Sequence, residues 1–411
     1  MKAIRIGICV LAAFTVLAFG TVEVWSESIL EASAAALFLG WAILVFLEPK
    51  IEIHWNLIFW PLLAFIGITG MQLAFGITAY PFLTRVALLK IGACALLFFL
   101  SVQSFRTRED VKFVVWFLMS FGFAVAVLGI AQYYTSHDVL YWFRPLTEGG
   151  NPFGPYVDRD HFAGFMELIV PVGMSLIAFQ GVRREQVAFA GILTLLPIAA
   201  LIMTASRGGI VSLVFEVGLL AALMRVRKAG FQAAAVAAIL LAALAVVGWL
   251  GAGQVLERIK IATVGSLSTD RRISMTRGAW HMFLDHPLSG TGLGTLVAVY
   301  PKYETLYDGK IIDHVHNDYA ELLAETGVAG GICGLIFLVM LLRESRRRLA
   351  EEQSAFSRAV HTSATVACAG LLVHGVVDFN FHIPANGLFF LLQTALVVSP
   401  VFHRRIQPLI T

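Results

Sequence analysis

Two histidines stand close together in the segment Asp313-His314-Val315-His316-Asn317-Asp318. A positioned imidazole can remove the proton of a hydroxyl group near pH 7, so a histidine at the start of a helix suits general-base chemistry. The helix dipole, positive at that end, would favour the neutral ring. The same segment also has an explanation without chemistry, in which Asn317 or Asp318 caps the helix that follows.

A metal site is another possible use of these histidines. Spacing of i and i+2 beside Asp318 offers three ligand groups, but no third histidine lies close by in the sequence. Metal-binding pairs on helices also prefer i and i+4 spacing. We therefore predict no metal ligands and no cofactor.

Arginines at two places have the geometry to bind phosphate. Arg207 lies in Ser206-Arg207-Gly208-Gly209, between two apolar runs, and Arg271-Arg272 lies in a long polar stretch. A guanidinium group is a planar fork of donors that matches phosphate oxygens. For Arg207 the simpler alternative is a tight turn in which the arginine extends to the membrane surface.

Further polar residues stand near apolar runs. Arg159 and His161 enter one run, whereas Arg85 and Lys90 lie inside another, and a charge inside a membrane helix is a functional candidate. For Arg85 the simpler alternative is a side chain that extends to the interface, whereas Lys90 needs a partner, for which Glu167 is a candidate. The Gly-Thr-Gly-Leu-Gly stretch at 290–294 follows no strand, so we interpret it as a tight loop after an amphipathic helix at 272–284, not as a nucleotide site.

The elements that must position these residues are membrane-spanning helices. Hydrophobic residues make up 58% of the 411 positions and charged residues 14%, and the apolar residues cluster in runs long enough to cross ~30 Å of hydrocarbon. The four cysteines fall inside such runs and are interpreted as buried apolar residues. We predict an all-α polytopic membrane protein of about twelve spans, forming a single domain over 1–411 with a large outer loop at 251–325. The predicted spans are 5–22, 29–47, 57–76, 82–103, 113–134, 162–181, 187–204, 209–225, 231–250, 326–342, 359–377 and 385–402.

The distribution of lysine and arginine gives the orientation. With both termini in the cytoplasm, most basic residues fall on the inner side, and the short outer loops near Glu23, Ala79 and Asp378 contain none. The residues that could take part in catalysis or binding then lie on the outer face.

The ordered set of motifs resembles the O-antigen ligase and O-antigen polymerase superfamily of bacterial inner membranes. The resemblance rests on Gly-x-x-x-x-Arg-x-His-Phe-Ala-Gly at 154–164, Ser-Arg-Gly-Gly at 206–209, Arg-Arg-Ile followed by His-Pro-Leu-x-Gly-x-Gly-x-Gly at 271–294, and His-Asn-Asp-Tyr at 316–319. It covers roughly residues 130–400.

The resemblance implies a metal-independent glycosyltransferase of the GT-C type, which acts on the periplasmic face. Its donor would be a glycan on undecaprenyl diphosphate, its acceptor a sugar hydroxyl of lipid A core or of another glycan, and its surroundings membrane lipids, with no nucleic acid involved. The catalytic residues carried over are His316, Arg207 and Arg272. His314 is an alternative to His316, and Arg271 to Arg272. The remaining substrate-binding candidates are Arg159, His161, Arg271, His314, Asn317, Arg85 and Lys90.

Two rival functions remain at this point. A polymerase or an O-oligosaccharyltransferase of the same superfamily would differ in the acceptor alone. A transporter or flippase would share the helix count, but charges concentrate in one outer loop and the two halves show no matching repeat.

Overall fold

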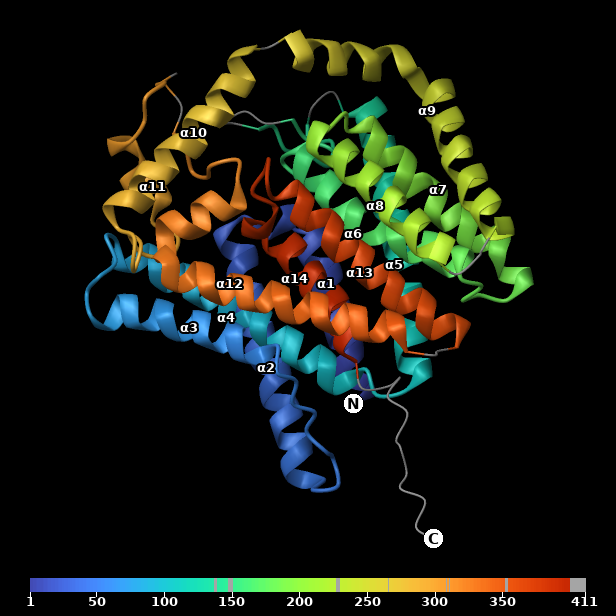
Figure 1. Ribbon diagram of the computed structural model, residues 1–411, viewed down its shortest axis with the longest axis horizontal. Helices are drawn as coiled ribbons and strands as arrows, with labels where there is room; N and C mark the ends of the chain where they lie inside the picture. The colour runs from blue at the N-terminus through green and yellow to red at the C-terminus, as the bar shows by residue number, and fades with distance from the viewer. Residues whose placement is uncertain are drawn as a thin grey trace.

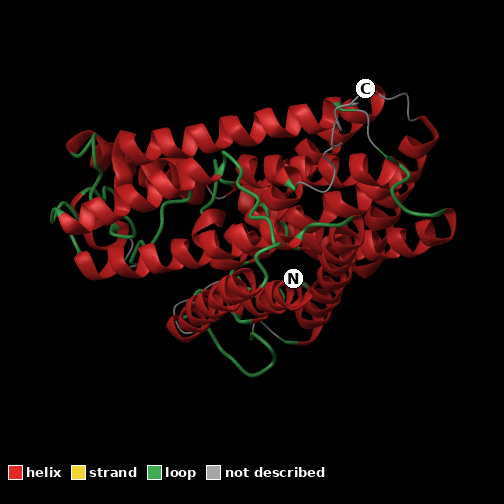
Figure 2. Ribbon diagram, turned by 90° about the horizontal axis from the view of Figure 1, so that it is seen from below, coloured by secondary structure: helices red, strands yellow, loops and turns green. Residues whose placement is uncertain are grey.

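A computed structural model describes residues 1–136, 139–146, 151–226, 230–264, 266–307, 309, 311–351 and 354–399, with side chains outside 226–231 and 251–270. These residues form helices and connections, and the described part contains no strand beyond three isolated bridges (Figure 2). The predicted all-α class is therefore confirmed. The helices are α1 Lys2–Leu17, α2 Val24–Leu47, α3 Phe59–Ala74, α4 Pro81–Ser104, α5 Arg108–Thr135, α6 Arg159–Ala178, α7 Val187–Met203, α8 Arg207–Val226, α9 Gly230–Val264, α10 Ser266–Asp285, α11 Leu296–Val299, α12 Asp318–Ala350, α13 Ala355–His374 and α14 Pro384–Val398.

Each predicted span overlaps one of these helices, and the last three residues of the span predicted at 385–402 lie outside the described residues. Nine helices within the described residues are long and apolar enough to cross a membrane, and the apolar helices α3 and α14 are shorter. α1 is also short, with 16 residues. The polytopic class is thus confirmed, and nine of the twelve predicted spans meet this criterion within the described residues. The four cysteines are free, and all except Cys94 are buried, as predicted.

α6 is the central helix of the bundle. Its residues from His161 to Ala178 are all buried, and it packs against α13, α7, α5, α8 and α14 (Figure 1). A helix that is apolar on all sides is stable only when other helices enclose it. The N-terminal end of α6, with Arg159 and His161, therefore has a fixed position among its neighbours.

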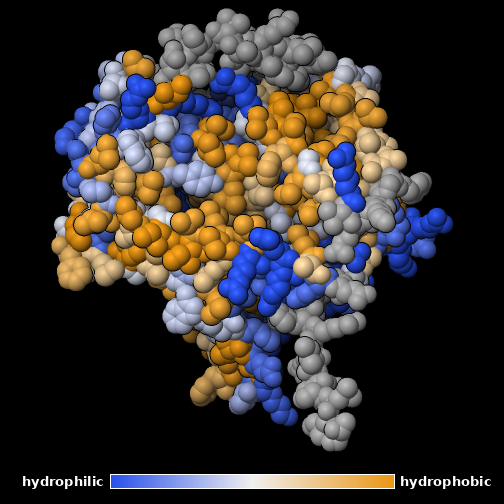
Figure 3. All heavy atoms as spheres, in the orientation of Figure 1, coloured by the Kyte–Doolittle hydropathy of each residue, from blue (hydrophilic) through white to orange (hydrophobic). Residues whose placement is uncertain are grey.

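The predicted outer loop is largely helical. α9 continues to Val264, beyond its predicted end at 250, and α10 covers the amphipathic segment predicted at 272–284. In Figure 1 these two helices form an arch along one side of the bundle, and α10 packs against α12. In Figure 3, hydrophilic side chains gather around α10 and α11, whereas the visible face over α12, α13 and α8 is mainly apolar.

The glycine-rich stretch at 290–294 is a tight loop, as predicted. Gly290, Gly292 and Gly294 all have positive φ angles, and a Cβ on Gly290 would lie 2.1 Å from the backbone of Glu325. The Glu325 carboxylate accepts hydrogen bonds from the N–H groups of Gly294 and Leu296, at 2.8 and 2.9 Å. These contacts attach the segment that follows α10 to α12.

α12 runs between two ends of the molecule, so residues near its two ends can test the orientation of the chain in the membrane. It has a break at Gly327, where φ is 62°, and then continues to Ala350. The part after the break is long enough to cross ~30 Å of hydrocarbon.

A cysteine replacing Ile311, which is 84% exposed and precedes α12, should react with an impermeant maleimide added to spheroplasts. A cysteine replacing the exposed Ala350 should react only after lysis, because the positive-inside distribution places that end in the cytoplasm.

A background without the four native cysteines provides the control for this experiment. Labelling of the cysteine at 350 in intact spheroplasts would contradict the orientation.

Candidate functional site

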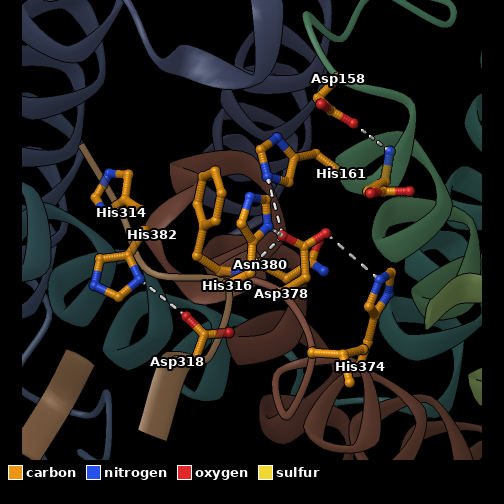
Figure 4. A network of polar contacts seen from close by, with 12 residues as sticks. Asp158, His161, His314, His316, Asp318, His374, Asp378, Asn380 and His382 are labelled. Atoms are coloured by element: carbon orange, nitrogen blue, oxygen red, sulfur yellow. Dashed lines mark hydrogen bonds and ion pairs between the residues drawn. The ribbon is translucent and has the colours of Figure 1, made fainter. Parts of the chain in front are cut away.

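The Asp378 carboxylate lies at the centre of a cluster of histidines. Asp378 is on the connection between α13 and α14, its side chain is 1% exposed, and three imidazole rings approach it (Figure 4). His316 Nδ1 lies 2.9 Å from Oδ1, His374 Nε2 lies 3.7 Å from Oδ2, and His161 Nε2 lies 4.0 Å from Oδ1. The cluster therefore joins α6, α13 and the segment before α12.

The ionisation of Asp378 follows from these contacts. Burial alone would raise the pKa of this carboxyl group, but the hydrogen bond from His316 and the charges of the neighbouring rings hold the pKa well below its usual range. An ionised carboxylate can only accept hydrogen bonds, so it selects the His316 tautomer with the proton on Nδ1. The lone pair of His316 is then on Nε2, and the His316 side chain is 26% exposed.

A second buried ion pair, between His374 and Glu167, lies next to Asp378. His374 Nδ1 lies 2.8 Å from Glu167 Oε1, and the two side chains are 1% and 0% exposed. His374 thus lies between two carboxylates, one on α6 and one after α13. Buried charges are stable only when they are paired and hydrogen-bonded, so this contact fixes the position of α13 relative to α6.

The start of α12 is held by local hydrogen bonds. Asn317 caps the helix, and its side chain accepts hydrogen bonds from the N–H groups of Tyr319 and Ala320. The Asp318 N–H lies 2.9 Å from the Gly375 carbonyl and 3.2 Å from the Asp378 carbonyl. The capping role considered for Asn317 is therefore confirmed, and the same contacts place His316 beside Asp378.

Arg272 extends from α10 to the edge of the cluster. Its Nη2 donates to Asp160 Oδ2 at 3.1 Å and its Nη1 donates to the Val377 carbonyl at 3.0 Å. The side chain is 28% exposed, so the guanidinium group is anchored on one side and accessible on the other. Arg271, its neighbour, is half-buried.

Arg207 is the exposed first residue of α8, and the glycines after it explain its placement. A Cβ on Gly208 would lie 2.4 Å from His374 Nε2, and one on Gly209 would lie 2.7 Å from the Ala163 side chain. The absence of side chains at 208 and 209 allows the first turn of α8 to pack directly against His374 and α6. The tight turn considered for this motif is present, and it places Arg207 beside the cluster.

A second group of side chains lies on the other side of Phe379. His314 Nδ1 is 2.6 Å from Glu321 Oε1, and His382 Nε2 is 3.2 Å from the same oxygen. His382 Nδ1 is 2.9 Å from Asp318 Oδ1, as Figure 4 shows. His314, Glu321 and His382 are the residues with potential metal-ligand atoms within 4.8 Å of one another in the described part of the chain. The sequence analysis missed this group because His382 is remote from His314 in the chain.

The remaining sequence candidates divide into two groups. Arg159 is half-buried at the first position of α6, close in sequence to Asp160 and His161. Lys90 forms an ion pair of 2.5 Å with Glu27 of α2, so Glu167 was the wrong partner for it. Arg85 is exposed in the first turn of α4. The described contacts join neither Arg85 nor Lys90 to the cluster.

Sequence reasoning missed Asp378, His374 and His382. His374 is near the end of the predicted span 359–377, and Asp378 and His382 lie in the short connection that follows it. The available pattern was a histidine and an aspartate at i and i+4 at the end of an apolar run, followed by Asn380 and His382. Ionisable residues at such a position are functional candidates.

These features define a polytopic helical membrane protein with a histidine–carboxylate site at one end of its bundle, flanked by arginines. Residues 192–335 match the family model described as O-antigen ligase. The match covers less than half of the chain, and over that part it supports the resemblance to the O-antigen ligase superfamily. None of the curated proteins matches the chain.

The matched region contains Arg207, Arg272 and His316 and ends before Asp378. The structure therefore adds the carboxylate partner of His316, which lies outside the matched residues.

The buried pair between Glu167 and His374 predicts a large loss of stability when one partner is removed. Glu167→Ala leaves His374 buried beside Asp378 alone and should lower the free energy of unfolding by about 3–5 kcal/mol. Glu109→Ala, which removes an exposed pair with Lys112, should change it by less than about 0.5 kcal/mol. A mixed-micelle unfolding titration measures both, and equal effects would show that the buried pair is not needed for stability.

Proposed function

We propose that this protein transfers a glycan from a polyprenyl diphosphate to a sugar hydroxyl on the periplasmic face, as an O-antigen ligase does. The observation that supports this most directly is the hydrogen bond of 2.9 Å between His316 and the buried Asp378, with Arg272 beside it. Such an arrangement provides a base for the acceptor and a cation for the leaving group in one place.

His316 acts as the general base in this proposal. The acceptor hydroxyl attacks the anomeric carbon of the donor, and its proton moves to His316 Nε2. Asp378 orients the ring and stabilises the imidazolium that forms, because its carboxylate bonds to Nδ1. The Asp378 carboxylate remains ionised throughout.

The arginines act on the leaving group. The bond between the anomeric carbon and the diphosphate oxygen breaks, and its electron pair stays on the diphosphate. Fixed guanidinium groups of Arg272 and Arg207 would stabilise that charge without a metal at the reacting centre. His161 contacts the cluster directly, and Arg159 and Arg271 are next in sequence to Asp160 and Arg272, so these three residues would bind the donor and acceptor.

The position of the cluster suits a lipid-linked donor. The histidines lie at helix ends: His316 precedes α12, His374 ends α13 and His161 is in the first turn of α6. A polyprenyl chain must stay in hydrocarbon, so its diphosphate reaches the protein at the membrane surface.

A strain that lacks the protein should accumulate the undecaprenyl diphosphate-linked glycan. A ligase would show loss of glycan-capped lipid A core, and a polymerase would show loss of long glycan chains.

Replacement of the base tests the chemistry. In a reconstituted assay with purified lipid-linked glycan, His316→Ala should lower the rate of transfer by about 10²–10⁴-fold, because the hydroxyl proton has no acceptor. Asp378→Asn should also lower it, since an amide can donate to Nδ1 and place the ring proton on Nε2.

In the His316→Ala background, Asp378→Asn should cause little further loss. His281→Ala, an exposed histidine of α10, is the control with unchanged rate. A near wild-type rate in His316→Ala would show that another group accepts the proton.

Arginine-to-lysine substitutions test the leaving-group role. Arg207→Lys and Arg272→Lys keep the charge but lose the planar fork of donors, so each should reduce transfer at least tenfold. Arg277→Lys, on the exposed face of α10, should have the wild-type rate. If Arg271→Lys were more harmful than Arg272→Lys, the arginine that binds the diphosphate would be Arg271.

A further inference from the structure

The group formed by His314, Glu321 and His382 has a composition unlike an ordinary ion pair. Two imidazole rings converge on one carboxylate oxygen, at 2.6 Å for His314 and 3.2 Å for His382. The Glu321 side chain is 0% exposed, while the His314 ring is 30% exposed. Two histidines and a glutamate are a ligand set that zinc uses in proteins.

The surroundings of His382 match those of a metal-binding histidine. Its Nδ1 lies 2.9 Å from Asp318 Oδ1, and Asp318 is itself buried and within 3.3 Å of the Phe381 N–H. Histidine ligands usually donate their second ring N–H to a carboxylate in this way, which directs the lone pair of the other nitrogen to the metal. In His382 that other nitrogen is Nε2, which faces Glu321.

The other two ligands are also held in place. The second oxygen of Glu321 accepts a hydrogen bond of 2.9 Å from the Val315 N–H, so the first oxygen is directed towards the histidines. The His314 ring stacks on Phe379 with a centroid distance of 4.8 Å and lies 4.6 Å from the ring of His382. The three ligand atoms lie within 4.8 Å of one another, and tetrahedral coordination at about 2.0–2.2 Å per bond fits between them after small side-chain shifts.

We propose that His314, Glu321 and His382 bind a divalent transition-metal ion of the zinc type, with a fourth position open to water on the exposed side of His314. The ion would connect the segment before α12, the first turn of α12 and the 3-10 turn Asn380–His382. It lies outside the reacting centre, since His316 faces Asp378 and not Glu321. Its function is to hold in place the segment that positions His316.

Zinc binding by the purified protein tests this proposal without any glycan substrate. The full chain, purified in detergent through an affinity tag that contains no histidine, should bind one zinc ion per chain by elemental analysis and calorimetry. His314→Ala and His382→Gln should abolish this binding, and Asp318→Asn should weaken it by about 10–100-fold. His286→Ala, an exposed histidine after α10, should bind zinc as the wild type does.

Thermal unfolding provides the second measurement. Zinc should raise the melting temperature of the wild type and of His286→Ala, because a ligand that binds the folded state stabilises it, and should leave that of His382→Gln unchanged. The proposal is overturned if the wild type binds no zinc, or if His314→Ala and His382→Gln bind it as tightly as the wild type. The three side chains would then be a hydrogen-bonded group occupied by protons alone. Neither result depends on whether His316 is the base for transfer.

Discussion

The desolvation of Asp378 constrains the arrangement of the whole site. A carboxylate that is 1% exposed at the end of a helical bundle is stable as an anion only if the protein replaces the water that it has lost. The replacement comes from His316, His374 and the Phe379 N–H. Because His316 precedes α12 and His374 ends α13, the ionised carboxylate requires these two helices to meet at one place.

The membrane imposes the layout around that carboxylate. Every polar group within the hydrocarbon must be satisfied by the protein itself, and Glu167 meets this requirement through His374. The glycines at 208 and 209 allow α8 to approach this pair without side chains between them. As a result the arginine at 207 is placed at the end of the bundle, beside a histidine whose orientation depends on a carboxylate from another helix.

The helices were predictable from the sequence because runs of apolar residues follow directly from the thickness of the bilayer. The ordered motifs named Arg207 and Arg272 as candidates, but not the residues beside them. Asp378, His374 and His382 were not found, since their role depends on how α13 and α14 pack against α6 and α12, and no local pattern contains that information. The partner of Lys90 was wrong for the same reason. Glu27 and Glu167 are equally plausible by sequence, and only the packing of α2 against α4 selects Glu27.

Phe379 explains how two histidines that are close in sequence, His314 and His316, contact two different carboxylates. The histidines at 314 and 316 both contact its ring, with centroid distances of 4.8 and 5.1 Å, yet His316 bonds to Asp378 and His314 bonds to Glu321. An aromatic ring offers no hydrogen-bond acceptor of comparable strength, so it separates the two polar groups while it packs against both imidazoles. With the ring between them, each imidazole keeps its own carboxylate partner. The separation between the His316–Asp378 pair and the His314–Glu321 pair therefore depends on an apolar side chain from the connection between α13 and α14.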